Sequence, residues 1–194
     1  MAMHMVTLSD EQREKLIAFV KERVAANDSF HDIGHVMRTA DMAILLAIRE
    51  KADQEVCWSA AMLHDICKRE PGDHAAEGAK QAKKFLMGIG VEEGFAERVR
   101  DAIHFHNKDF DDSAPIERKI LWDADKLYIV TPDGFRMRMI PYWVMKKGRK
   151  DGIETAVSEY HFFMARFHTE KGRKEAGKYS VEMEKYIREL ESEA

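Results

Sequence analysis

The stretch VCWSAAMLHDIC places a histidine and an aspartate, His64 and Asp65, side by side in an otherwise apolar segment. Burying an ionised carboxylate without a partner is costly or forces the group to take up a proton. A histidine beside it in the same segment indicates that a bound cation supplies the compensating charge. A hydrogen-bonded His–Asp pair in the core, without a metal, would satisfy the same pattern. The pair is therefore a candidate metal site with one structural alternative.

A second His–Asp pair, His31 and Asp32, lies in the stretch SFHDIGHVMRTA. It comes just before Gly34 at the start of a predicted helix, where polar side chains commonly cap exposed backbone amides. We therefore expect a capping or orienting role for this pair rather than direct metal binding. His35 is the better candidate for the site, and Arg38 follows three residues later on the same helical face.

Two more carboxylates lie in the stretch ILWDADKLYIV, again with little polar surface around them. Asp123 and Asp125 flank an alanine, and each continues a different apolar stripe of the predicted helix. Helical periodicity therefore does not choose between them.

These candidates are positioned by helices, because helical periodicity recurs along the chain and strand-like alternation is hard to find. The first helix opens with Ser9 and Gln12 in capping-box spacing, and Pro115 suits the first turn of a later one. The predicted helices cover residues 9–27, 34–50, 54–68, 74–88, 92–106, 115–131, 152–168 and 173–192. The predicted fold class is all-α, with a single-domain helical bundle over residues 8–194. Residues 1–7 are expected to be an unstructured N-terminal segment or a remnant of the expressed sequence.

Composition and charge exclude several function classes. The chain has 194 residues, of which 45% are hydrophobic and 34% charged, as in ordinary globular proteins. No stretch is long and apolar enough to span a membrane. The net charge of −4 gives no electrostatic reason to expect a nucleic-acid polymer as partner.

Whether the two cysteines, Cys57 and Cys67, can form a disulfide bears on the cellular compartment. On one continuous helix they would lie about 15 Å apart along the axis, too far for a disulfide. Free thiols fit a reducing cytoplasm, and the N-terminus has no basic region followed by an apolar run that would mark a secretory signal. We therefore expect a cytoplasmic protein.

The motifs HDIGHVMRTA, AAMLHDICK and LWDADKL, taken in order, resemble the HD-domain superfamily of metal-dependent phosphohydrolases. The tail HFFMARFHTEKGRKEAGKYSVEMEKYIRELESE resembles the C-terminal helices of a branch of small, stand-alone bacterial and archaeal members. The resemblance implies that the metal ligands are His35, His64, Asp65 and Asp125. Asp123 then lies outside this set, orienting a ligand or serving a second metal. The chain departs from the branch at Tyr128, where an aspartate is usual, and the stretch 128–140 is unfamiliar.

A mixed set of imidazoles and carboxylates suits Mn²⁺, Fe²⁺, Mg²⁺, Co²⁺ or Ni²⁺ better than a structural zinc site. The resemblance implies a reaction in which a metal-bound water attacks a phosphoester or phosphoanhydride. Lys68 and Lys126 would neutralise the developing charge, and Arg38 is a further candidate for phosphate contact. The structural alternative for each cation is a solvated charge or an ion pair within the protein.

Two further histidines bear on the number of metal ions. His74, in HAAEGA, and His106, in IHFHN, face inward on their predicted helices. They resemble the positions that bind a second ion in two-metal branches of the superfamily. In single-metal branches such histidines act as general acids or contact phosphate; packed core histidines are the structural alternative. We expect both in the pocket, with one or two divalent ions bound.

The expected substrate is a phosphorylated small molecule, a nucleotide or related metabolite, and the expected enzyme is a metal-dependent phosphohydrolase. Three alternatives use the same residues: a two-metal cyclic-nucleotide or dinucleotide phosphodiesterase, a di-iron oxygenase of the superfamily, and a non-catalytic nucleotide sensor. The sequence is also compatible with a homo-oligomer.

Overall fold

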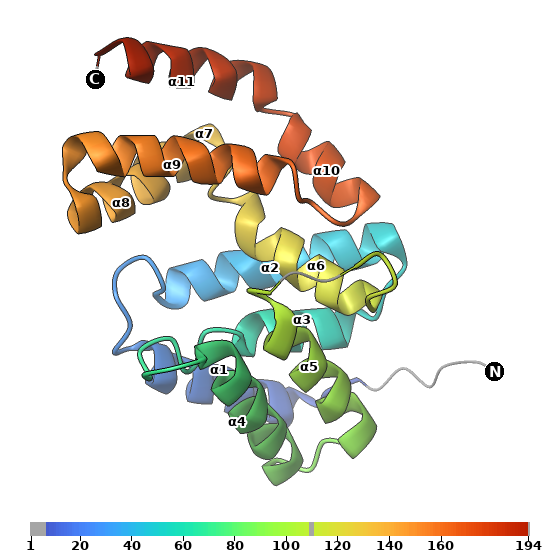
Figure 1. Cartoon of the computed structure of the whole chain (residues 1–194). Helices are drawn as coiled ribbons and strands as arrows, with labels where there is room; N and C mark the ends of the chain where they lie inside the picture. The colour runs from blue at the N-terminus through green and yellow to red at the C-terminus, as the bar shows by residue number, and fades with distance from the viewer. Residues whose placement is uncertain (1–6, 109–110, 194) are drawn as a thin grey trace.

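The computed structural model describes residues 7–108 and 111–193, so residues 1–6 of the expected N-terminal segment lie outside the described part. Every regular element in these ranges is helical (Figure 1), which confirms the all-α prediction. The elements, in chain order, are α1 (Asp10–Val24), α2 (Ile33–Glu50), α3 (Gln54–Leu63), α4 (His74–Gly88), α5 (Glu93–Phe105), α6 (Ile116–Leu127), α7 (Pro132–Gly134), the π-helix η1 (Phe135–Met139), α8 (Ile140–Lys147), α9 (Arg149–Met164), α10 (Glu170–Gly177) and α11 (Ser180–Glu193).

Capping side chains fix where several helices begin. Ser9 forms the predicted capping box at α1. The Asp32 carboxylate accepts a hydrogen bond from the backbone N–H of His35 at the start of α2, which confirms its predicted capping role. Asp53 and Asp73 cap α3 and α4 in the same way. The first turn of α2, which carries His35, is therefore held by its own local sequence.

Helices α2 and α6 run through the middle of the molecule, with α1, α3, α4 and α5 on one side and α7–α11 on the other (Figure 1). Helix α2 packs against both α3 and α6, and α3 also packs against α6. Their contact surfaces are built from fully buried apolar side chains such as Val36, Leu63 and Leu121. The three motifs of the sequence therefore meet at one place in the core.

Helix α3 is shorter than the predicted helix over residues 54–68, because it ends at Leu63. The chain continues in tight turns, in which the Lys68 amide bonds the Asp65 carbonyl at 3.1 Å. The apolar pattern runs on through Ile66 and Cys67 because this turn is itself buried. Cys67 therefore does not share a helix with Cys57, so the premise of the spacing argument is wrong, although both thiols are free and buried.

Helices also occupy residues 132–147, where none was predicted. Pro132 and Gly134 suppress helix prediction there, yet a proline is tolerated in a first turn, and Pro132 and Pro141 both have that place. The π-helix between them, Phe135–Met139, has no sequence signature. The helix predicted over 173–192 is divided into α10 and α11, and the one predicted over 115–131 ends at Leu127.

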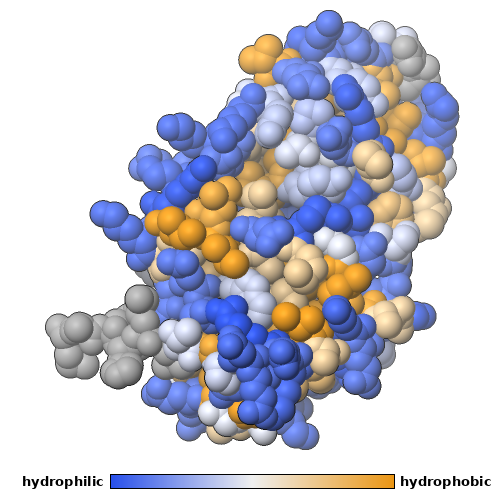
Figure 2. All heavy atoms as spheres, turned by 180° about the vertical axis from the view of Figure 1, so that it is seen from behind, coloured by the Kyte–Doolittle hydropathy of each residue, from blue (hydrophilic) through white to orange (hydrophobic). Residues whose placement is uncertain are grey.

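The face of the molecule opposite to the view of Figure 1 is largely polar (Figure 2). Figure 2 shows hydrophilic residues over most of one face, with apolar residues in separate patches between them. Across residues 7–108 and 111–193, no helix has the length and apolar character that crossing a membrane requires.

Candidate metal centre

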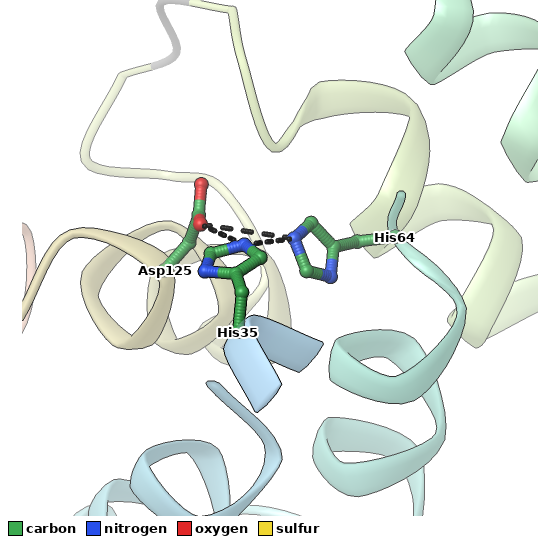
Figure 3. Close-up of side chains that lie close together, drawn as sticks. All are labelled: His35, His64 and Asp125. Carbon is green, nitrogen blue, oxygen red and sulfur yellow. Dashed lines mark hydrogen bonds and ion pairs between the residues drawn. The ribbon is translucent and has the colours of Figure 1, made fainter. Parts of the chain in front are cut away.

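Three helices bring the candidate ligands together from distant parts of the chain. His35 lies in the first turn of α2, His64 and Asp65 directly follow α3, and Asp125 lies near the end of α6. Figure 3 shows the side chains of His35, His64 and Asp125 pointing toward one another. All four side chains of the set are buried, with exposures between 1% and 8%.

The distances within this set fit a single bound ion. The Nε2 atoms of His35 and His64 are 3.1 Å apart, and Asp125 Oδ1 lies 3.2 Å from His35 Nε2. Asp65 Oδ2 lies 3.3 Å from His64 Nε2 and 3.6 Å from His35 Nε2. Ligand atoms that share an ion at about 2.1 Å are themselves roughly 3 Å apart. The donor set, two imidazoles and two carboxylates, matches the ligands preferred by divalent ions such as Mn²⁺ or Fe²⁺.

Backbone carbonyls orient two of the imidazoles. His64 Nδ1 lies 2.7 Å from the Ala61 carbonyl oxygen, and His106 Nδ1 lies 2.7 Å from that of Ile103. Because a carbonyl oxygen only accepts hydrogen bonds, each Nδ1 carries the hydrogen in the neutral ring. Each Nε2 is then left with its lone pair directed into the site, which is the arrangement found in metal-binding histidines.

The electrostatics of the cluster reflect close packing of opposite charges. Burial alone would raise the pKa of Asp65, but the neighbouring imidazole of His64 and its other partners hold that pKa well below its usual range. Burial acts in the same direction on Asp125, and there Lys126 and His35 are the main opposing groups. For His35, burial would lower the pKa, but hydrogen bonds to Asp125 and Asp65 raise it to about 9. The carboxylates are therefore ionised at neutral pH and attract a cation.

A second cluster adjoins the first and shares Asp65 with it. One ligand atom each from Asp65, His74 and His106 lies within 4.8 Å of the others. Asp65 Oδ1, which faces away from the first cluster, is 3.9 Å from His106 Nε2. Asp65 Oδ1 and His74 Nε2 are buried and have no hydrogen-bond partner in the described structure. Buried polar atoms without a hydrogen bond are rare. The charged neighbour of Asp65 Oδ1 is the Lys68 ammonium, at 3.7 Å, and a second cation between Asp65 Oδ1 and His74 Nε2 would satisfy both atoms.

The predicted phosphate-binding lysines lie beside the first cluster. Lys68 Nζ is 3.7 Å from Asp65 Oδ1. Lys126 Nζ contacts Asp125 Oδ2 and lies 5.6 Å from the centre of the Phe163 ring. Both lysines line the same cavity, which has a volume of about 220 Å³ and is open to His35, Asp65 and Asp125.

The structure does not bring Arg38 to the cavity. Its guanidinium stacks on Tyr128 at 4.7 Å from the ring centre, and Arg38 is not among the residues that line the cavity.

Asp123 also differs from the expectation. Its carboxylate is fully buried and accepts hydrogen bonds from the backbone amides of His168 and Thr169 at 2.8 and 2.9 Å. Asp123 therefore ties α6 to the start of α10, and neither of its oxygens is turned to the metal ligands.

The sequence reading missed the opposite wall of the cavity. This wall consists of Phe30, Ile129, Arg138, Met139, Tyr142, Trp143, Glu159 and Phe163, most of them from residues 129–163. Arg138 fixes the wall to the loop before α2 by donating hydrogen bonds to the backbone carbonyls of Ser29 and Phe30. The signals available were the aromatic pair in PYWV and the acidic Glu159 directly before the stretch YHFF.

Known proteins resemble this chain over nearly its whole length. YpgQ, an uncharacterized protein of Bacillus subtilis strain 168, is 24% identical over 192 residues, which cover 94% of each chain. The crystal structure of YpgQ in complex with ADP has a TM-score of 0.74, with 23% identity over 95% of each chain.

Two further similar structures are of proteins described as HD-superfamily hydrolases. An HD-superfamily hydrolase from Bacillus thuringiensis is 26% identical with a TM-score of 0.75, covering 94% of this chain and 96% of its own. A predicted HD superfamily hydrolase from an uncultured Thermotogales bacterium is also 26% identical, with a TM-score of 0.67, covering 93% of this chain and 91% of its own. The HD domain itself matches residues 31–128, the range that holds both histidine–carboxylate clusters. This chain is therefore a member of the HD domain family.

Proposed function

We propose that the protein is a metal-dependent phosphohydrolase that cleaves a phosphoester or phosphoanhydride of a nucleotide or related metabolite. One observation carries the proposal: a buried set of two imidazoles and two carboxylates opens into a cavity that two lysines also line. A hydrolase of phosphate compounds needs an electrophile, a water and cations next to a small cavity. This arrangement supplies the places for all three.

The residues have separate roles in this proposal. His35, His64, Asp65 and Asp125 would hold the divalent ion, which supplies electrophilic activation of phosphorus and a more acidic water. Lys68 and Lys126 bind the phosphate oxygens and neutralise charge as it develops on the leaving group. The apolar side chains around Phe163 and Met139 restrict water in the cavity, which strengthens these charge interactions.

A nucleotide is the proposed substrate for two reasons. The cavity combines cationic side chains with aromatic ones, which suits a ligand that carries both a phosphate and a flat ring. YpgQ, which has the same fold, was crystallised with ADP. We also propose a reducing compartment such as the cytoplasm, supported by the free thiols of Cys57 and Cys67.

The test is hydrolysis of a nucleotide panel by metal-stripped protein that has been refilled with Mn²⁺, with phosphate and pyrophosphate release measured separately. We expect turnover, and we expect Asp65→Ala to abolish it because this carboxylate contacts both histidine clusters. Asp41→Ala, an exposed position on α2 outside the cavity, is the matched control and should keep wild-type turnover. Lack of turnover with every tri-, di-, mono- and cyclic nucleotide would contradict the proposal.

The second cluster favours a second candidate, a two-metal phosphodiesterase acting on cyclic nucleotides or dinucleotides. Asp65, His74 and His106 are placed so that one carboxylate serves both clusters. Metal analysis of the same preparations distinguishes the two candidates. Two ions per chain, with the second lost in His106→Ala and cyclic substrates cleaved, would favour the phosphodiesterase; one ion per chain would exclude it. Oxygen consumption by an iron-loaded protein would instead indicate the di-iron oxygenase.

A further inference from the structure

The cavity has two chemically different ends. One end carries the metal-ligand candidates with Lys68 and Lys126, and the other wall is mainly aromatic and aliphatic, with two charged side chains, Arg138 and Glu159. The Arg138 guanidinium is already engaged by the carbonyls of Ser29 and Phe30. It also lies 3.7 Å from Asp32 Oδ1.

On the apolar side, Phe30 and Tyr142 meet edge to face at 5.3 Å between ring centres, and Tyr142 and Trp143 do so at 5.1 Å. A ligand that fills the cavity would therefore meet lysines beside the metal-ligand candidates and, on the other wall, mostly apolar side chains with the Glu159 carboxylate among them.

Glu159 is a carboxylate on the apolar side. It lines the cavity from α9, belongs to neither histidine cluster, and is half-buried. The indole N–H of Trp143 donates a hydrogen bond to its Oε2 at 2.8 Å. The described residues offer no hydrogen bond or ion pair to its other oxygen, Oε1. Oε1 is not one of the buried side-chain oxygens that lack a partner, so it is accessible to solvent and available to a ligand in the cavity.

We propose that Glu159 selects the uncharged end of the substrate, with Oε1 accepting a hydrogen bond from a nucleobase amino group or a sugar hydroxyl. The inference rests on the proposed function, because it assumes that the phosphate lies at the lysine end. A carboxylate here repels a second phosphate group, so it also fixes which way round the substrate enters. Glu159 is in this sense a specificity residue.

Trp143 determines whether residue 159 presents a hydrogen-bond acceptor or a donor to the cavity. An indole nitrogen is a donor only, so it must face an oxygen. In Glu159→Gln the amide oxygen stays with Trp143 and the amide NH₂ is turned to the cavity. The substitution therefore replaces an acceptor with a donor at nearly constant volume. In the double variant Trp143→Phe/Glu159→Gln the amide is free to turn, and its oxygen can face the ligand again.

The experiment measures dissociation constants by calorimetry on the Mn²⁺-loaded full chain, with hydrolysis-resistant ligands so that no turnover is required. The ligands are methylene analogues of ADP, CDP and UDP, the 2′,3′-dideoxy form of the ADP analogue, and methylenediphosphonate as the hydrolysis-resistant form of pyrophosphate. The proteins are the wild type, Glu159→Gln, Trp143→Phe, and the double variant. Glu154→Gln is the matched control, since it removes the same charge from an exposed position of the same helix.

We expect Glu159→Gln to weaken nucleotide binding by about tenfold, the usual effect of losing a hydrogen bond to a charged group. The pyrophosphate analogue should bind as tightly as to wild type or more tightly, and the double variant should recover most of the loss. If the donor is an amino group, the loss is confined to the ADP and CDP analogues. If it is a sugar hydroxyl, the loss extends to UDP and disappears for the dideoxy ligand.

The inference would be overturned if each ligand bound Glu159→Gln as tightly as it binds the wild type. It would also be overturned if Glu159→Gln weakened binding of the pyrophosphate analogue as much as that of the nucleotides, or if Glu154→Gln showed the same loss. The two proposals fail separately. Selective binding without turnover contradicts the proposed hydrolysis and supports the role of Glu159. Turnover without this selectivity supports the proposed hydrolysis and contradicts the role of Glu159.

Discussion

At the scale of single residues, the central feature is His35, which the protein must deprotonate before it can serve as a ligand. Burial would lower its pKa, but Asp125 and Asp65 raise it to about 9 in the metal-free protein. At neutral pH and without a metal ion, His35 is therefore protonated, and its positive charge interacts with the two carboxylates. Metal and proton compete for the same Nε2, so metal affinity should increase as the pH rises toward 9.

The same competition makes the stability of the metal-free protein depend on pH. A histidine whose pKa rises from 6.5 to about 9 on folding stabilises the folded state fully below pH 6.5, and this contribution is lost as the pH rises through 9. We expect the unfolding free energy of chelator-treated protein to fall by a few kcal/mol over this range, measured by urea denaturation. His35→Gln should lack this component. A wild-type profile that runs parallel to that of His35→Gln would show that the carboxylates do not hold the proton there.

How far the sequence predicts individual residues depends on where their partners lie. The expectation that His35, His64, Asp65 and Asp125 belong together rested on motif order, and these side chains do converge. Arg38 and Asp123 were assigned to the same neighbourhood, but their partners come from other parts of the chain. A stacking ring at Tyr128 and the amides that follow α9 decide their orientation. Helical periodicity carries no information about such long-range partners.

At the scale of elements, the junction between α6 and α10 is a close approach that depends on a glycine. A Cβ added to Gly172 would overlap with Asp123 Oδ2 and come within 2.8 Å of Thr169 Oγ1. Thr169 caps α10 by accepting a hydrogen bond from the Gly172 amide, and its hydroxyl donates to Asp123 at 2.7 Å. Helix α10 is thus attached to the helix that carries Asp125 through one buried carboxylate.

We expect Gly172→Ala to destabilise the protein by about 1–3 kcal/mol, because the added Cβ would overlap with a buried carboxylate and a hydroxyl that are hydrogen-bonded to each other. Gly177→Ala in the same helix is the matched control, since its added Cβ meets nothing within 4 Å. Replacing glycine by alanine in a helix usually stabilises by up to about 1 kcal/mol, so the two variants should shift the thermal midpoint in opposite directions. Equal midpoints would mean that the junction relaxes without cost.

The elements themselves were predicted where caps and periodicity agree. Helix α4 has the predicted bounds, α2 begins one residue earlier than predicted, and α5 is shorter by one residue at each end. The differences elsewhere have identifiable causes, some local and one from packing. A buried turn after α3 retains the apolar spacing of a helix, and the prolines of residues 132–147 stand at helix starts rather than at breaks. The π-helix depends on packing around Phe135 and Met139, both buried, which no local pattern reports.

At the scale of the whole molecule, the candidate metal centre links α2, α6 and the turn after α3. An ion held there would bind the folded chain and not the unfolded one, since the ligands are distant in sequence. Its binding free energy is then added to stability.

We therefore expect chelation to lower the thermal midpoint of the metal-loaded protein. At a free-ion concentration of one hundred times the dissociation constant the stabilisation is about 2.7 kcal/mol, equivalent to roughly 5–10 °C for a chain of this size. Calorimetry with and without Mn²⁺ measures it. Asp65→Ala should show no such shift. A protein that binds one equivalent of ion without any change in midpoint would place the ion outside the core.

The cavity is assembled from two stretches of chain with different content. Every candidate metal ligand lies within residues 31–128, the range that matches the HD domain, whereas Arg138, Tyr142, Trp143 and Glu159 lie beyond it. Cavity-facing positions of the later stretch such as Glu159 hold no candidate metal ligand, whereas Arg138 and the Gly172 junction also support the helices that carry those ligands. Such a division would let the substrate-facing side chains change while the candidate metal ligands stay the same. A chimaera that keeps residues 1–128 of this chain and takes the remainder from a relative would show which of the two stretches determines the substrate.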